Sequence, residues 1–169
     1  QETIAFAALK HGNQKMPTGL PYVVHLSNVA MEVFMAHKKE PNFNIDLAIQ
    51  LALLHDVLED TPLSFKELED TFGNIVATGV LALTKNASLD KKDQMQDSLA
   101  RIVQQGKEVA IVKLCDRITN LQKPPLKWDK EKIKKYHLHA VTIAETLQGK
   151  NAYLDKRLQE KIKAFIVFI

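Results

Sequence analysis

Apolar residues recur at helical spacing along nearly the whole chain, and this periodicity constrains the fold more than any other feature. Glycine, proline and asparagine interrupt the pattern at intervals that suit helices of ordinary length. The pattern predicts helices over residues 4–9, 22–37, 45–60, 75–84, 90–105, 108–121, 129–148 and 152–168. A capping box at residues 64–67 (SFKE) predicts one more helix, which ends near Phe72. Residues 109–112 (VAIV) would also suit a strand, and propensity alone leaves that choice open.

Length and composition agree with one globular domain. The 169 residues, of which 46% are hydrophobic and 25% charged, suffice for a single domain with a real core. No internal repeat or long linker divides the chain. We therefore expect a single all-α domain, a helical bundle, over residues 1–169.

The charge balance and the cysteine content exclude several classes of protein. With 23 Lys and Arg against 20 Asp and Glu, the net charge of +3 indicates neither a nucleic-acid groove nor a membrane surface. Cys115 is the only cysteine, which excludes an internal disulfide and a cysteine-based zinc site. No apolar run approaches the roughly 18 residues of a membrane span, and the first residues lack a signal-peptide pattern. We expect a cytoplasmic protein with no DNA or membrane partner.

The predicted helix over residues 45–60 is apolar nearly all round, yet its last turn and a half carries one histidine and three carboxylates. A spacing of four places His55 beneath Glu59 and Asp56 beneath Asp60. Carboxylates at a helix C-terminus oppose the helix dipole at a cost of about 0.3–1 kcal/mol each, and burial adds to that cost. A bound divalent metal would offset this electrostatic cost. The alternative is that Glu59 and Asp60 form the solvated end of a helix.

Two further segments supply residues of the same kind. His25 follows a loop at residues 19–22 (GLPY), and Asp116 emerges from an apolar segment. Together with His55 and Asp56 they provide two imidazoles and two carboxylates. That donor set suits a borderline or hard divalent ion such as Mn²⁺, with positions left for water and substrate.

Four motifs then occur in a characteristic order. They are HGNQK (residues 11–15), GLPYVVH (19–25), LLHDVLEDT (53–61) and KLCDRITNL (113–121). In this order they resemble the HD phosphohydrolase superfamily and, within it, the SpoT-type alarmone hydrolases. The similarity extends from about Thr3 to the final helix. The length leaves no room for a synthetase or regulatory domain, so the resemblance is to the stand-alone small alarmone hydrolases.

The resemblance implies a manganese-dependent hydrolase of guanosine tetra- and pentaphosphate, (p)ppGpp. Such an enzyme removes pyrophosphate from the ribose 3′ position and returns GDP or GTP. Glu59 and Asp60 match the acidic pair that orients and deprotonates the attacking water. The implied metal ligands are His25, His55, Asp56 and Asp116.

Residues for substrate binding follow from the same resemblance. Lys15 stands where relatives have an arginine that packs against guanine; lysine lacks the planar guanidinium, which leaves the base preference open. Tyr22 would form an aromatic wall, or it packs at a helix start. Asn120 would reach the sugar or a phosphate. Lys132 and Tyr136 match a basic residue and a tyrosine that contact the alarmone, although Lys132 could be one of several solvated lysines.

Two rival functions remain at this point. One is an HD phosphohydrolase acting on a nucleotide with a ribose 2′- or 3′-phosphate. The other is a non-catalytic nucleotide-binding module, which the intact metal-ligand set disfavours and which Lys15 alone favours.

Two other residues are interpreted as core, namely Cys115 and Trp128. Three histidines are interpreted as surface or packing residues, namely His37, His137 and His139.

Overall fold

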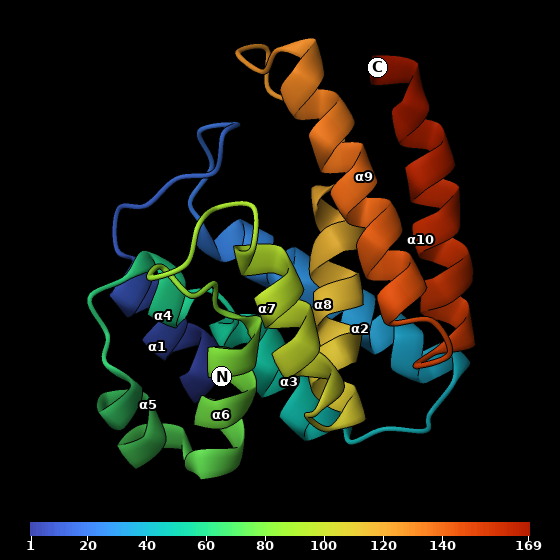
Figure 1. Ribbon diagram of the computed structural model, residues 1–169. Coiled ribbons are helices and arrows are strands. Elements are labelled where there is room, and N and C mark those ends of the chain that lie inside the picture. Colours follow the sequence, from blue (N-terminus) through green and yellow to red (C-terminus); the bar gives the residue numbers. More distant parts are fainter.

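The computed structural model describes all 169 residues and is helical throughout, which confirms the all-α prediction (Figure 1). In chain order the elements are α1 (Glu2–His11), α2 (Val23–Lys39), α3 (Ile45–Leu54), α4 (Val57–Asp60), α5 (Phe65–Phe72), α6 (Asn74–Leu83), α7 (Gln94–Val103), α8 (Lys107–Asn120), α9 (Lys130–Thr146), α10 (Ala152–Phe165) and the 3₁₀ turn η1 (Ile166–Phe168). Residues 109–112 belong to α8, so the strand alternative is wrong. The one β-type pairing is an isolated bridge between Lys15 and Pro21.

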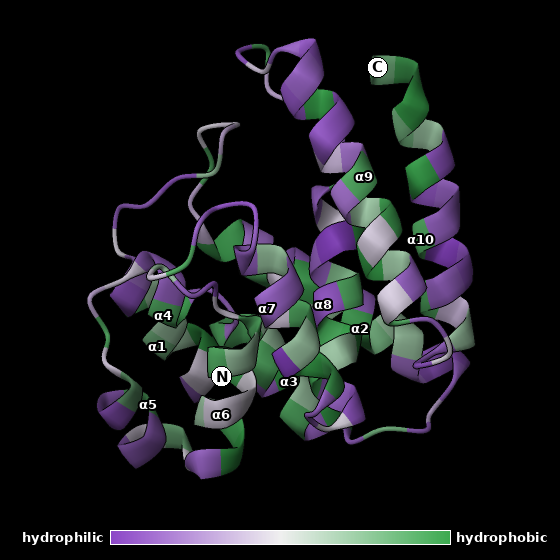
Figure 2. Cartoon of the chain, in the orientation of Figure 1, coloured by the Kyte–Doolittle hydropathy of each residue, from purple (hydrophilic) through white to green (hydrophobic).

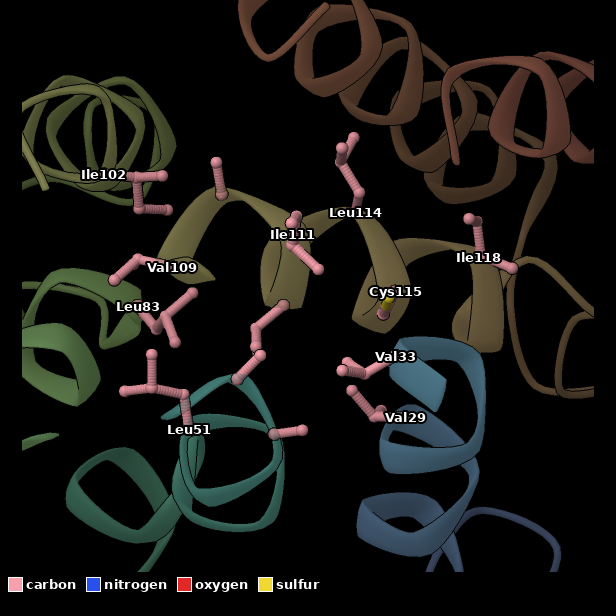
Figure 3. Packing of buried hydrophobic residues seen from close by; sticks show 14 of the residues in the cluster. Val29, Val33, Leu51, Leu83, Ile102, Val109, Ile111, Leu114, Cys115 and Ile118 are labelled. Atoms are coloured by element: carbon pink, nitrogen blue, oxygen red, sulfur yellow. The ribbon is translucent and has the colours of Figure 1, made fainter. Parts of the chain in front are cut away.

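Helix α8 forms the centre of the fold. Ten of its fourteen residues are buried, and α2, α3, α6, α7, α9 and α10 all contact it (Figure 3). Ile111, Leu114 and Ile118 are fully buried in the core that these helices share. Because six helices pack around α8, Asp116, Arg117 and Thr119 near its C-terminal end are buried, whereas Asn120 at the end is exposed.

Hydropathy follows this arrangement. Helices α3 and α6 are largely hydrophobic, and α8 mixes hydrophobic and hydrophilic residues, whereas α9 and α10 pack as a pair and carry hydrophilic residues on their outer faces (Figure 2). Burial of apolar surface is the main favourable term in folding, and a single cluster of 38 buried residues extends from Ala7 to Phe165. No helix in the chain is both long enough and apolar enough to cross a membrane.

The predicted helix over residues 45–60 is broken in the structure. Helix α3 ends at Leu54 and α4 begins at Val57, so His55 and Asp56 form a turn between them. The His55 ring contributes to the break, because its Nδ1 lies 2.8 Å from the Ala52 carbonyl and competes with the backbone for that acceptor. The prediction of two stripes on one continuous helix was therefore wrong.

Other helix boundaries agree with the predicted ones more closely. Helix α7 starts at Gln94 rather than at residue 90, because residues 90–93 form a turn closed by the Asp93 N–H and the Asp90 carbonyl at 2.8 Å. The capping box at Ser64 is present with both of its hydrogen bonds. Gly73 follows α5 with φ at +84°, a conformation that only glycine adopts easily.

Candidate metal centre and active site

Side chains from three separate segments meet at one point beside α8. His25 comes from the first turn of α2, where it continues the buried stripe of Val29 and Val33. His55 and Asp56 come from the turn between α3 and α4, and Asp116 comes from α8. His25, His55 and Asp116 are buried and Asp56 is half-buried, which removes the group from bulk water.

The separations between these side chains suit a common ion. The two Nε2 atoms of His25 and His55 are 3.3 Å apart, and Asp56 Oδ2 lies 3.8 Å from the first and 3.0 Å from the second. Asp116 Oδ1 lies 3.4 Å from His25 Nε2 and 3.8 Å from His55 Nε2. Ligand atoms about 2.1 Å from one ion are at most about 4.2 Å apart, so every one of these distances is compatible. The ligand atoms of His25, His55 and Asp56 all lie within 4.8 Å of one another, and Asp116 stands outside this closest group.

The hydrogen bonds of His55 prepare it to act as a ligand. A backbone carbonyl can only accept a hydrogen bond, so Nδ1 of His55 carries the proton that points to Ala52. In the neutral ring, Nε2 then presents its lone pair to the cluster, as metal-binding histidines do. The donor chemistry of the site therefore fits a divalent cation.

The electrostatics of the cluster also favour a cation. Burial opposes charge on every member, but His55 lowers the pKa of Asp56 well below its usual range. A hydrogen bond to His25 and the charge of Lys113 lower the pKa of Asp116 in the same way. Although burial lowers the pKa of His55, Asp56 and Asp116 raise it to about 9. Both carboxylates thus stay ionised, and their negative charge attracts positive charge to the site.

Tyr22 and Asn120 both hydrogen-bond to carboxylates of this cluster. The Tyr22 hydroxyl donates to Asp56 Oδ2, and Asn120 Nδ2 donates to Asp116 Oδ1. Burial and the neighbouring Asp56 raise the pKa of Tyr22 far above its usual value, so the hydroxyl keeps its proton. Both residues also line the cavity in front of the cluster, and their first role is to orient Asp56 and Asp116.

Glu59 and Asp60 line the same cavity from α4. Glu59 pairs with the Lys85 ammonium and accepts a hydrogen bond from the Lys85 backbone N–H at 3.1 Å. Asp60 Oδ2 accepts from Gln14 Nε2 at 2.8 Å, and Gln14 Oε1 lies 2.8 Å from His11 Nδ1. Both residues are exposed at the end of α4, as the solvated-end alternative expects, but each carboxylate is also held by a distant segment.

The cavity has a volume of about 270 Å³ and contains cations that the sequence analysis did not single out. Lys113 lies 3.6 Å from Asp116 Oδ2, while Arg117 and Lys85 line the wall. Gln14 was missed in the same way. Gln14, Lys113 and Arg117 lie inside the four motifs, and this position is the signal that could have identified them. Lys85 lies outside every motif, so no sequence signal pointed to it.

A larger cavity of about 790 Å³ adjoins the first, and Asn120 and Tyr136 line both. Trp128 lines this second cavity and is only half-buried. Its ring meets Tyr136 edge-on at 5.0 Å, and Lys132 Nζ lies 4.7 Å over it. Trp128 packs against the hydrophobic core from its edge, so the interpretation as a packing residue holds, but one side of the ring also faces this cavity.

The remaining candidates lie as follows. Lys15 is exposed on the loop before α2 and lines neither cavity. Cys115 is fully buried, as expected. His139 lines the first cavity from α9 but is not part of the metal cluster.

The chain is similar to known proteins in sequence and in structure. The family model described as "HD domain" matches residues 3–143. A protein of Danio rerio named guanosine-3′,5′-bis(diphosphate) 3′-pyrophosphohydrolase MESH1 is 35% identical over 165 residues, which cover 94% of this chain and 89% of that one. The protein of the same name from Drosophila melanogaster is 32% identical and covers 94% and 90%.

A solved structure shows the same likeness in three dimensions. It belongs to a protein described as a metazoan ortholog of SpoT that hydrolyzes ppGpp. The two chains superpose with a TM-score of 0.82 at 31% identity, covering 96% of this chain and 93% of the other. The similarity therefore extends over nearly the whole chain.

Proposed function

The chain belongs to the HD domain family, in the group of the MESH1 and SpoT-type proteins, and from this premise we propose that it is a metal-dependent (p)ppGpp 3′-pyrophosphohydrolase. One observation carries the proposal. The ligand atoms of His25, His55 and Asp56 lie within 4.8 Å of one another, and Asp116 lies 3.4 and 3.8 Å from the two imidazoles, next to two more carboxylates in one cavity. The overall reaction adds one water to ppGpp or pppGpp and yields GDP or GTP plus pyrophosphate.

The metal is proposed to be Mn²⁺. Two nitrogen and two oxygen donors suit a borderline or hard divalent ion and do not suit a soft one. When bound, such an ion lowers the pKa of a coordinated water and neutralises charge on phosphoryl oxygens. The proposed ligands are His25, His55, Asp56 and Asp116.

Glu59 and Asp60 are proposed to handle the attacking water. Glu59 takes the proton of the water, and Asp60, which Gln14 holds in place, orients it. The water oxygen forms a bond to the phosphorus attached to the ribose 3′-oxygen, the bond between that phosphorus and the 3′-oxygen breaks, and the 3′-oxygen takes up a proton. The pyrophosphate keeps the new oxygen. Lys85 stays paired with Glu59 and balances its charge before the proton arrives.

The nucleoside is proposed to lie in the larger cavity. Tyr136 and Trp128 offer aromatic surface to a base, and Asn120 stands between the two cavities, where a sugar or phosphate oxygen would pass. Tyr22 closes the metal side of the first cavity. Lys132, over Trp128, and Lys15, on the adjacent loop, are proposed to contribute positive charge to substrate binding.

Two broader proposals accompany this function. We propose that residues 1–169 act as one domain, since one hydrophobic cluster includes residues from α1 to α10. We also propose a cytoplasmic location, since a lone buried cysteine suits a reducing compartment.

The test is hydrolysis of ppGpp by the purified protein with Mn²⁺ and again after chelation, with the products separated by anion-exchange chromatography. The expected products are GDP and pyrophosphate in equal amounts, with turnover lost on chelation and restored by Mn²⁺. Release of orthophosphate, or faster turnover of a nucleotide with a 2′- or 3′-monophosphate, would favour the phosphatase alternative. Tight binding of ppGpp without turnover at any metal concentration would favour a nucleotide sensor.

A further inference from the structure

Arg117 is a buried cation without a partner. Its exposed fraction is 9%, and the guanidinium Nε and Nη1 are buried with no hydrogen-bond acceptor. The other two arginines of the chain differ from it, because Arg101 binds Asp97 and Arg157 binds Glu32 through two nitrogens each. No carboxylate lies within ion-pair distance of Arg117.

The cation–π contact of Arg117 leaves its charge uncompensated. The guanidinium lies over the Tyr136 ring at 4.3 Å from the centroid. Such stacking uses the face of the guanidinium and leaves its N–H groups free for an anion. An arginine stays charged in proteins, and a buried charge without a counter-charge is costly. An anion from outside the chain would remove that cost.

Arg117 also lines a side cavity of about 340 Å³ that lies beyond the metal site. Glu59 is the only carboxylate on its wall, and Lys85 already pairs with it. Burial and the nearby Arg117 lower the pKa of His139, which reflects the positive potential there. The side cavity has five basic residues on its wall, namely Lys85, Lys91, Lys113, Arg117 and His139.

The three cavities form a series with the metal site in the middle. The larger cavity shares Asn120 and Tyr136 with the metal cavity. The side cavity shares Arg117, Lys113, Lys85, Glu59 and His139 with it. If the phosphorus under attack lies at the metal and the nucleoside lies in the larger, aromatic cavity, the group still attached to that phosphorus extends into the basic side cavity.

We infer that the side cavity binds the terminal phosphate of the 3′-pyrophosphate, with Arg117 as the residue that recognises it. This inference rests on the proposed function and gives a structural reason for the substrate specificity of the enzyme. A nucleotide with a single 3′-phosphate places nothing in the side cavity and offers Arg117 no terminal phosphate. The chain thereby selects a 3′-pyrophosphate over a 3′-monophosphate.

The test compares R117Q and R117K with the parent protein on four ligands. Guanosine 5′-diphosphate 3′-diphosphate is the substrate. Its analogues with a 3′-monophosphate and with a 5′-monophosphate are measured as substrates and as competitive inhibitors, and inorganic pyrophosphate is measured as a product inhibitor. K156Q, which removes an exposed positive charge on α10, is the matched control for net charge.

R117Q is expected to lower kcat/KM for ppGpp by about 10- to 100-fold, the loss typical of a charged hydrogen bond. Inhibition by pyrophosphate should weaken by a similar factor. Inhibition by the 3′-monophosphate analogue should change less than threefold, and R117K should recover part of the loss. Bound manganese, measured by mass spectrometry, should be unchanged, which shows that Asp116 next to Arg117 still binds.

Three outcomes would overturn the inference. Equal losses for ppGpp and for the 3′-monophosphate analogue would make Arg117 a structural residue. A loss that disappears with the 5′-monophosphate analogue would assign the side cavity to the 5′-phosphates. Unaltered kinetics in R117Q would remove any role in binding. Failure of the parent protein to hydrolyse ppGpp would instead contradict the proposed function, and direct binding of pyrophosphate to the parent and R117Q would still test the side cavity.

Discussion

Asp56 is the side chain on which most contacts of the site converge. Its Oδ2 accepts from the Tyr22 hydroxyl and lies within 4 Å of both imidazole Nε2 atoms. Asp116 makes the corresponding contacts from α8. A carboxylate that contacts this many partners cannot readily be replaced by a neutral side chain.

Asp56→Ala and Asp116→Ala are each expected to abolish metal retention and activity, because each removes one of only two carboxylates in the cluster. Metal content by mass spectrometry and ppGpp turnover check the prediction. Asp46→Ala, an exposed carboxylate in α3, is the matched control and should retain both. Full turnover of either variant with metal absent would show that these residues are not ligands.

Glu59→Gln separates proton transfer from metal binding. The amide keeps the shape of the side chain but cannot take a proton from water, so kcat should fall by roughly 10²- to 10⁴-fold. Metal content should stay at the parent level, since Glu59 contacts Lys85 and none of the four ligands. Near-normal turnover would reject Glu59 as the base and leave Asp60 as the candidate.

Gln14 is a positioning residue, because it reaches the site through Asp60. Gln14→Ala is expected to lower kcat by about tenfold with little change in KM, the lower end of the range for a hydrogen bond to a charged group. In an Asp60→Asn background the same change should cost much less, since the partner has already been altered. Additive losses in the double variant would mean that Gln14 acts on something other than Asp60.

At the scale of elements, the break between α3 and α4 presents the His-Asp pair to the site. Periodicity located the segment but not the break, because the bond from His55 to Ala52 involves a side chain and leaves the apolar pattern unchanged. The capping box before α5 was predicted correctly, since all of its atoms lie within four consecutive residues. Local patterns therefore predict the helices better than they predict how a helix ends at a functional residue.

Helices α3, α6 and α8 meet at Gly79, where any larger side chain would require a neighbouring side chain to move. A Cβ at this position would lie 2.7 Å from Leu51 Cδ2 and 3.3 Å from Val109 Cγ2. Leu51→Ala is expected to cost about 2–5 kcal/mol of unfolding free energy. Gly79→Ala should be less destabilising, or even stabilising, in the Leu51→Ala background, because the new methyl group enters the vacated space. Denaturant unfolding of the four proteins measures this coupling, and strictly additive changes would contradict it.

At the scale of the whole molecule, the metal site joins α2, the α3–α4 turn and α8. An ion that binds only the folded state stabilises it, by about 2.7 kcal/mol at a hundredfold excess over its Kd. Saturating Mn²⁺ should therefore raise Tm by about 5–10 °C for a chain of this size. Differential scanning calorimetry checks this, with Asp116→Ala as the variant that should lose the shift. An equal shift in that variant would place the bound ion elsewhere.

The sequence by itself determined the all-helical class, most helix boundaries and the residues that we propose as metal ligands. These are local properties, because periodicity, caps and motifs each span a few turns of helix. Only the tertiary structure decided which polar groups meet, as when Lys85 reaches Glu59 across 26 positions and Gln14 reaches Asp60 across 46. It also decided that Arg117 on α8 lies over Tyr136 on α9 and has no hydrogen-bond acceptor for its buried nitrogens. Such pairings depend on the packing of distant helices, and no pattern in a short window of residues records them.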